Sequence, residues 1–218
     1  MVYRLGNSVR VIDRMYLTDA LLAVLYPQSC RICGGSVERR RFGVACEQCW
    51  KKTRICADRF AIGWYEGALR ETVLLLKRQP YLPPHLVALL VEASKSFAGV
   101  TRVVPVPLHK ERLRSRGFNQ AAIIGREMSR ALAVPFDEVS LVRVTSSEKH
   151  RTGLDAKGRR DSVAKAFVVR RPRLIDGEDV LLVDDVFTTG ATAEACQEAL
   201  LGAGANCVLI FALAKARQ

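Results

Sequence analysis

The sequence lacks an apolar run long enough to cross a bilayer as a helix, which needs about 20 residues. Its longest uninterrupted apolar run near the N-terminus extends only from Ala20 to Tyr26. Arginines precede this run as in a signal peptide, but Asp13 and Asp19 lie among and after them, and Pro27-Gln28-Ser29 is a poor cleavage site. We therefore expect a cytoplasmic protein that does not insert into a membrane.

The two common glycine-rich phosphate loops are also missing, since neither G-x-x-x-x-G-K-[ST] nor G-x-G-x-x-G occurs. No internal repeat or low-complexity tract interrupts the chain. With 218 residues, 49% of them hydrophobic, it is long enough for one sizeable domain with a small appendage.

Acidic residues are in the minority: 22 Asp and Glu stand against 34 Lys and Arg, for a net charge of +12. Such an excess favours polyanionic partners, either nucleic acid or a phosphate-rich substrate. The charge does not decide between these two, and a basic surface that serves only solubility is the third interpretation.

A different phosphate-binding arrangement begins at residue 180. The apolar run Val180–Val183 leads into Asp184 and Asp185, and a turn rich in threonine precedes an alanine-rich stretch. This order predicts a buried parallel strand that ends in two carboxylates, followed by a helix N-terminus that binds a phosphate. Adjacent carboxylates suit the two hydroxyls of a ribose, and Gly190 lets the backbone approach an anion closely. The other expected binding residues of the turn are Thr188, Thr189, Ala191 and Thr192.

The segment resembles the phosphoribosyl pyrophosphate (PRPP) motif of type I phosphoribosyltransferases. In those enzymes the two acids after the strand hold the ribose, and the following loop holds the 5′-phosphate. The resemblance implies that Asp184 and Asp185 bind PRPP together with Mg²⁺ and take part in catalysis. The alternative is a solvated acid pair beside an ordinary turn.

Seven cysteines are present, and four of them form two C-x-x-C pairs. Cys30 and Cys33 make the first pair, and Cys46 and Cys49 make the second, with twelve residues between the pairs. An odd number of cysteines without a leader argues for metal ligation over disulfides. Four thiolates satisfy tetrahedral Zn²⁺, so we predict a structural zinc, with an iron–sulfur cluster or four free cysteines as alternatives.

Two basic stretches follow. Residues 108–118 carry four lysines and arginines between a strand and a helix, and we expect them to form a basic loop. Residues 143–165 carry seven more and show no hydrophobic periodicity. A loop of this length is either a lid over a ligand or a plain excursion.

Hydrophobic periodicity predicts an α/β fold with a mostly parallel sheet flanked by helices. The expected helices cover residues 10–26, 69–77, 85–98, 119–133 and 192–201, and the expected strands cover 60–65, 102–107, 167–170, 180–185 and 207–214. We divide the chain into an N-terminal helix (1–29), a four-cysteine module (30–57) and a phosphoribosyltransferase-like domain (58–218).

Taken together, these features resemble the ComF family, whose members carry a double C-x-x-C module and a phosphoribosyltransferase domain and are associated with DNA uptake in natural competence. The matching residues, besides the four cysteines, are Tyr65-Glu66-Gly67 with Arg70 and Lys77, Val104–Leu108, Arg116–Ala121, Gly158-Arg159-Arg160 with Phe167, Leu182–Val186 and Thr188–Thr192.

The resemblance implies further site residues and partners. Pro107, Leu108 and Arg116 would bind the pyrophosphate side of PRPP, and Arg160 and Lys165 would act in catalysis. Single-stranded DNA and a competence helicase are the implied partners. Two functions stay open: a competence protein that binds PRPP and single-stranded DNA, or an active phosphoribosyltransferase that transfers to an unidentified acceptor and has no DNA role.

Overall fold

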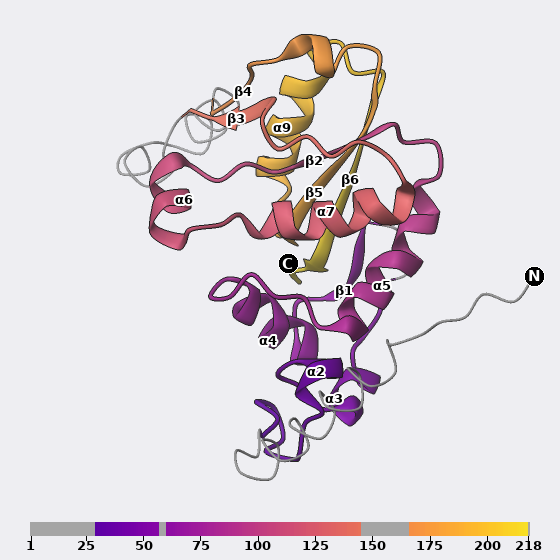
Figure 1. Cartoon of the computed structure of the whole chain (residues 1–218), viewed down its shortest axis with the longest axis vertical. Coiled ribbons are helices and arrows are strands. Elements are labelled where there is room, and N and C mark those ends of the chain that lie inside the picture. Colours follow the sequence, from indigo (N-terminus) through magenta and orange to yellow (C-terminus); the bar gives the residue numbers. More distant parts are fainter. Residues whose placement is uncertain (1–28, 57–59, 145–165, 218) are drawn as a thin grey trace, which may run out of the picture.

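The computed structural model describes residues 29–56, 60–144 and 166–217 (Figure 1). In these ranges strands alternate with helices, as the sequence predicts. The helices are α2 (Arg39–Phe42), α3 (Glu47–Lys51), α4 (Gly67–Leu76), α5 (Pro84–Ser94), α6 (Lys110–Arg116), α7 (Gln120–Leu132) and α9 (Ala191–Leu201), with short 3₁₀ turns at Lys95–Phe97 and Pro172–Leu174. The strands are β1 (Ala61–Trp64), β2 (Arg102–Pro105), β3 (Leu141–Arg143), β4 (Phe167–Val169), β5 (Asp179–Phe187) and β6 (Cys207–Lys215).

Four strands form one parallel sheet in the order β1-β6-β5-β2, and β3 pairs with β4 as a separate antiparallel ribbon. The chain crosses from β1 at one edge to β2 at the other and then fills the centre with β5 and β6. Residues Val180–Val183 of β5 have no exposed surface, because both faces of the central strand are covered. All four carboxyl ends meet at one edge, where ligands bind in open α/β sheets.

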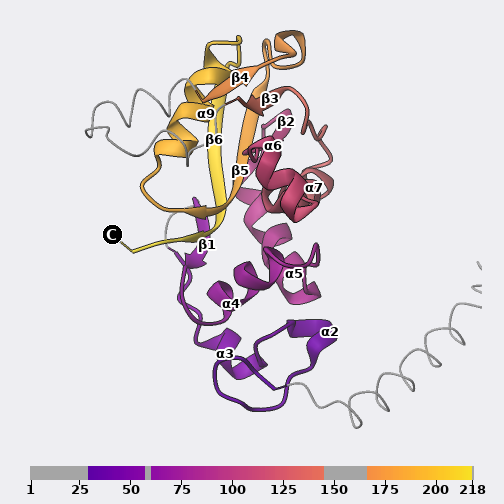
Figure 2. The ribbon, with the colours of Figure 1, turned by 90° about the vertical axis from the view of Figure 1, so that its left-hand side faces the viewer.

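Helices cover both faces of this sheet (Figures 1 and 2). Leu181 and Val183 pack into a cluster with residues of α4, α5 and α7, whereas Val180 and Leu182 pack against α9 and the β3–β4 ribbon. This alternation follows from the two-residue period of a strand. The predicted α/β fold with a parallel sheet flanked by helices is confirmed.

The four-cysteine module packs against the start of α5. The ring centroids of Phe42 and Trp50 lie 5.1 Å and 4.9 Å from that of His85, and Trp50 Nε1 donates to the Phe42 carbonyl at 3.0 Å. Phe42, Trp50 and two of the cysteines belong to the same apolar cluster as Leu69 and Leu86. The module therefore shares its core with the helices beside it.

The prediction of a basic loop after β2 is wrong, because residues 110–116 form α6. His109 caps this helix by accepting the Glu111 N–H at its Nδ1, and Gly117 ends it at a φ of 81°. A helix of seven residues is too short to show periodicity in sequence.

Two other expectations need correction. β5 does not end at the carboxylates: it continues to Phe187, because β6 keeps pairing with it as far as Lys215. The long loop expected from residue 143 begins later, since residues 141–143 form β3. The predicted helix over 10–26 and most of that loop lie outside the described residues. No helix in the described part of the chain has the length and apolar character needed to span a membrane.

Candidate functional site

The turn that follows β5 lies at the carboxyl edge of the sheet, near its centre. Thr188 and Thr189 are exposed, and Gly190 adopts a φ of 86° as the N-cap of the eleven-residue helix α9. A Cβ at Gly190 would come within 3.0 Å of the Phe187 ring, so glycine is needed for both conformation and space. No side chain of the described residues caps α9. Its first N–H groups are thus available to an anion.

The two carboxylates before this turn belong to opposite sides of the strand. Asp184 accepts a 2.8 Å hydrogen bond from the backbone N–H of Asp185 and interacts with the Cys196 thiol of α9. Asp185 lies on the other side, where its Oδ2 is 3.4 Å from Nζ of Lys77 at the end of α4. Lys77 matched a family pattern in sequence, but only the tertiary structure identifies it as a neighbour of the acid pair.

Asp184 differs from an ordinary aspartate in its acidity. Burial raises its pKa from 3.8 to about 8, and the adjacent carboxylate of Asp185 contributes in the same direction. Burial also raises the pKa of the Cys196 thiol, with a further contribution from Asp184. The raised pKa therefore favours the protonated form of Asp184 at neutral pH.

The raised pKa of Asp184 predicts that the stability of the protein depends on pH. Between about pH 4 and 8 the folded chain keeps a proton on Asp184 that the unfolded chain has lost, so the free energy of unfolding falls as the pH rises. Asp184 contributes at most about 1.4 kcal/mol per pH unit to this decrease in the free energy of unfolding. Asp184→Asn cannot titrate and should flatten the profile, as urea denaturation at about pH 5 and about pH 8 will measure. The exposed control Glu198→Gln should keep the wild-type slope; an equally steep profile in Asp184→Asn would contradict the assignment.

The loop after β2 reaches the same edge beside β5. Pro105 pairs with Val183, and the Val106 N–H donates to the Val183 carbonyl at 2.8 Å. Pro107 and Leu108 follow immediately, so the structure brings them to the strand that carries the acid pair.

Asn119 was not predicted as a site residue, but it connects this loop to α7. Its Nδ2 donates to the Val106 carbonyl at 3.0 Å, and its Oδ1 accepts the Ala121 N–H at 3.1 Å. An asparagine directly before an apolar periodic segment is the sequence signal for such a cap. Arg116 is held by the Gln120 side chain at 2.6 Å, and both belong to the α6–α7 segment.

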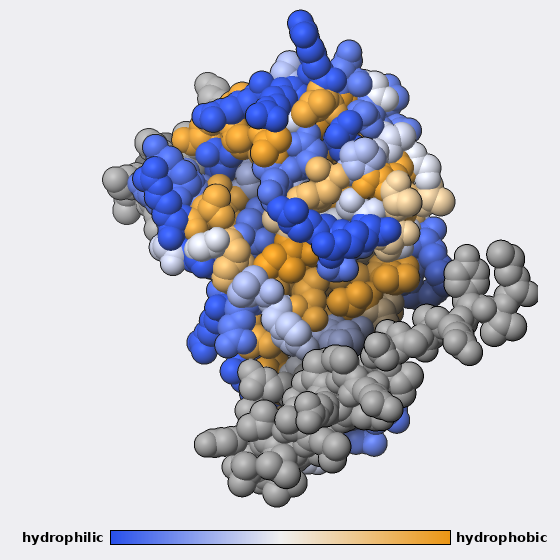
Figure 3. Space-filling model, viewed as in Figure 1, coloured by the Kyte–Doolittle hydropathy of each residue, from blue (hydrophilic) through white to orange (hydrophobic). Residues whose placement is uncertain are grey.

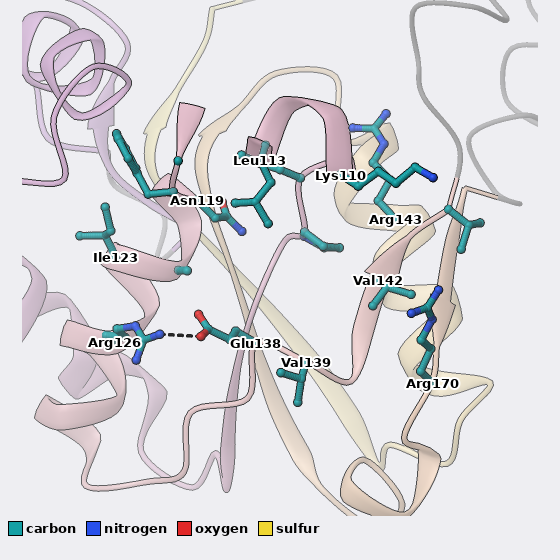
Figure 4. A pocket seen from close by; sticks show the side chains of 16 residues that line it. Lys110, Leu113, Asn119, Ile123, Arg126, Glu138, Val139, Val142, Arg143 and Arg170 are labelled. Carbon is teal, nitrogen blue, oxygen red and sulfur yellow. Dashed lines mark hydrogen bonds and ion pairs between the residues drawn. The ribbon is translucent and has the colours of Figure 1, made fainter. Parts of the chain in front are cut away.

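A cavity of about 740 Å³ opens next to this loop, between α6, α7 and the β3–β4 ribbon (Figure 4). Pro107 and Leu108 form part of its wall. The acid pair, the threonine turn and Arg116 are not among the lining residues, so the cavity lies beside the predicted PRPP site. Arg160 and Lys165, expected to act in catalysis, lie outside the described residues.

The four cysteines come together at the other end of the chain. Their sulfur atoms all lie within 4.8 Å of one another, with Cys30–Cys49 and Cys33–Cys46 distances of 3.7 Å, so none is in a disulfide. Burial alone would raise the pKa of Cys30, but backbone N–H groups, including that of Cys46 at 3.3 Å, lower it to about 6. Burial raises the pKa of Cys49 to about 12. The cluster is compatible with a metal site.

Comparison with known proteins identifies relatives of part of this chain. A family model described as the phosphoribosyl transferase domain matches residues 115–218. DNA utilization protein YhgH of Escherichia coli O157:H7 is 32% identical over 114 residues, or 52% of this chain and 49% of that protein.

Two competence proteins are also similar. Competence protein F of Haemophilus influenzae is 34% identical over 118 residues, or 52% of this chain and 50% of that protein. Competence protein ComFC of Bacillus subtilis is 30% identical over 102 residues, or 47% of this chain and 39% of that protein. The matches thus span half or less of the length of these relatives.

Proposed function

We propose that this chain, a phosphoribosyl transferase domain protein related to competence protein F, ComFC and YhgH, binds PRPP at residues 184–192. The observation that carries the proposal is the junction of β5 and α9, where two carboxylates and the uncapped N-terminus of a helix lie at the carboxyl edge of a parallel sheet. Isothermal titration with PRPP and Mg²⁺ tests it, and the same titration with a short DNA oligomer tests the second ligand proposed below.

Each part of PRPP has a proposed partner. The N–H groups and hydroxyls of residues 188–192 bind the 5′-phosphate, and Asp184 and Asp185 accept hydrogen bonds from the ribose hydroxyls. The pyrophosphate, which carries Mg²⁺, lies toward Pro107, Leu108 and Arg116. Lys77 holds Asp185 in place before the ligand arrives.

Catalytic turnover of PRPP is a second candidate function. It is favoured by the presence of both acids and the complete phosphate turn at one edge of the sheet. The chain would then transfer the phosphoribosyl group to an acceptor and release pyrophosphate. We propose that Arg160 and Lys165 stabilise the negative charge that develops on this leaving group. Pyrophosphate release on addition of candidate acceptors is the measurement.

We propose a structural zinc in the four-cysteine cluster. Four sulfurs at the usual Zn–S distance of about 2.3 Å in a tetrahedron are about 3.8 Å apart. The 3.7 Å separations of Cys30–Cys49 and Cys33–Cys46 match this edge length. A four-iron cluster places each thiolate on a different iron and requires wider spacing than the 4.8 Å limit here. A closed tetrahedral site has no open position, so its role is to hold the module together.

Single-stranded DNA is the proposed second ligand, as part of DNA handling in natural transformation with a competence helicase as partner. The net charge of +12 and the names of the relatives support this extension. In α6 the side chains of Arg112 and Arg114 are exposed, so this helix presents cations on the surface.

The DNA proposal predicts a steep salt dependence. If α6 and residues 151–160 neutralise roughly five phosphates, the single-strand slope of about −0.7 per phosphate gives a log–log slope near −3.5. Affinity should then fall by roughly a hundredfold between about 50 and 200 mM salt. Replacing Arg112, Arg114 and Arg116 by alanine should flatten the slope by about two units in fluorescence anisotropy.

A matched control removes three exposed cations elsewhere, at Lys51, Lys52 and Lys95, and should leave the slope near the wild-type value. A triple arginine variant that loses PRPP but keeps the wild-type DNA slope would show that these arginines serve the pyrophosphate, and would count against DNA binding by α6.

A further inference from the structure

The cavity beside the loop after β2 has the size of a ligand site. Its volume of about 740 Å³ lies within the range of about 300–1,000 Å³ typical of small-molecule pockets. Leu113, Ile123, Val139 and Val142 line it, from α6, α7, the following loop and β3 (Figure 4). Leu113 is 43% exposed and Val139 46% exposed. Apolar side chains gathered around an open cavity mark a binding site.

The polar groups of the cavity are distributed unevenly. Lys110, Arg143 and Arg170 lie on the side of α6 and the ribbon, whereas Arg126 and Glu138 form a 2.6 Å ion pair on the side of α7 (Figure 4). One side therefore attracts an anion. The other offers a guanidinium donor and a carboxylate acceptor next to the apolar lining.

Further cations lie in the segments that supply these groups. Arg112 and Arg114 belong to α6 together with Lys110, and Arg171 and Arg173 follow Arg170 after β4; all four are exposed. These segments thus carry more exposed positive charge than one small anion requires. This charge suits a polyanion that has a repeating apolar group.

We propose that this cavity receives one nucleotide of a single DNA strand, with the base inside and its phosphates on the flanking cations. The base packs between Leu113, Ile123 and Val142, and its hydrogen-bonding edge faces the Arg126–Glu138 pair. The inference rests on the proposed binding of single-stranded DNA and gives that ligand a specific site. An acidic helical peptide fits less well, because it would lay several apolar side chains along an extended groove.

The test separates the contribution of the base from that of the charge. Fluorescence anisotropy compares an oligonucleotide with an abasic strand of the same length and charge, using wild type, Val139→Trp and Val168→Trp. Wild type should bind the normal strand about tenfold more tightly, because this factor lies within the range measured for one base stacked on an aromatic side chain, and Phe118 is an aromatic residue of the lining. Val139→Trp fills the cavity without changing charge and should abolish the difference. Val168→Trp, at a valine 44% exposed on β4 and outside the cavity, should keep it.

Each other outcome overturns the proposal in a distinguishable way. Equal binding of both strands by wild type would exclude the base site but leave charge-driven DNA binding standing. Binding of neither strand at low salt would exclude DNA binding altogether. An acidic amphipathic peptide that binds wild type and not Val139→Trp, with no base effect, would identify a protein partner. If circular dichroism shows that Val139→Trp is misfolded, Leu113→Trp takes its place in the experiment, and the expected result is the same.

Discussion

Replacing Asp184 and Asp185 together by alanine is expected to weaken PRPP binding at least tenfold. A lost hydrogen bond to a charged carboxylate such as that of Asp185 contributes about 1.5–3 kcal/mol, and about 1.4 kcal/mol corresponds to a factor of ten. The variant also leaves Lys77 without its carboxylate partner, which lies 3.4 Å away in the wild type. Isothermal titration with PRPP and Mg²⁺ measures the change.

A control for this experiment removes an acid that does not reach the site. Glu198 is exposed on α9, and Glu198→Ala should bind PRPP as the wild type does. Lys77→Gln adds a finer test: if Lys77 holds Asp185 in place, this variant should bind PRPP less tightly than wild type but better than the double alanine variant. Wild-type affinity in the double variant would show that the acid pair does not bind ribose.

Serine at Cys30 or Cys46 is expected to release the metal and unfold the N-terminal module, while the sheet stays largely intact. Structural zinc contributes about 10–16 kcal/mol to the folding of small zinc domains at neutral pH, which exceeds what this short segment can replace by packing. Because Trp50 lies against His85, its fluorescence should change on unfolding, and a Trp64→Phe background isolates this signal.

Elemental analysis provides the direct measurement, with about one zinc per wild-type chain and none in the serine variants. Cys207→Ser removes a half-exposed thiol outside the cluster and should retain the metal. Wild-type protein that contains neither zinc nor iron after purification would refute the metal site.

Local signals in the sequence were sufficient for much of the fold. The central strand is recognisable because Val180–Val183 is buried on both faces and therefore uniformly apolar. Helix α7 is recognisable because Asn119 caps it and Ile124 and Met128 repeat at helical spacing on its buried side. The four cysteines are recognisable because their spacing in sequence already fixes two thiolate pairs.

Interactions between distant segments were not predictable in this way. Lys77 and Asp185 are 108 positions apart, and only the packing of α4 against the sheet brings them to 3.4 Å. The raised pKa of Asp184 depends on burial, which is a property of the assembled layers. The cavity likewise needs α6, α7 and the β3–β4 ribbon in place.

The sequence by itself therefore determined the element order, the acid pair that follows an apolar strand segment and precedes a threonine-rich turn, and the four-cysteine set, because each depends on neighbouring residues. Only the tertiary structure decided that residues 110–116 are helical, that β5 continues to Phe187, and that the cysteine module shares a core with α4 and α5. The physical reason is that these features depend on partners distant in sequence: the pairing of β6, and the apolar surfaces that meet when the helices pack.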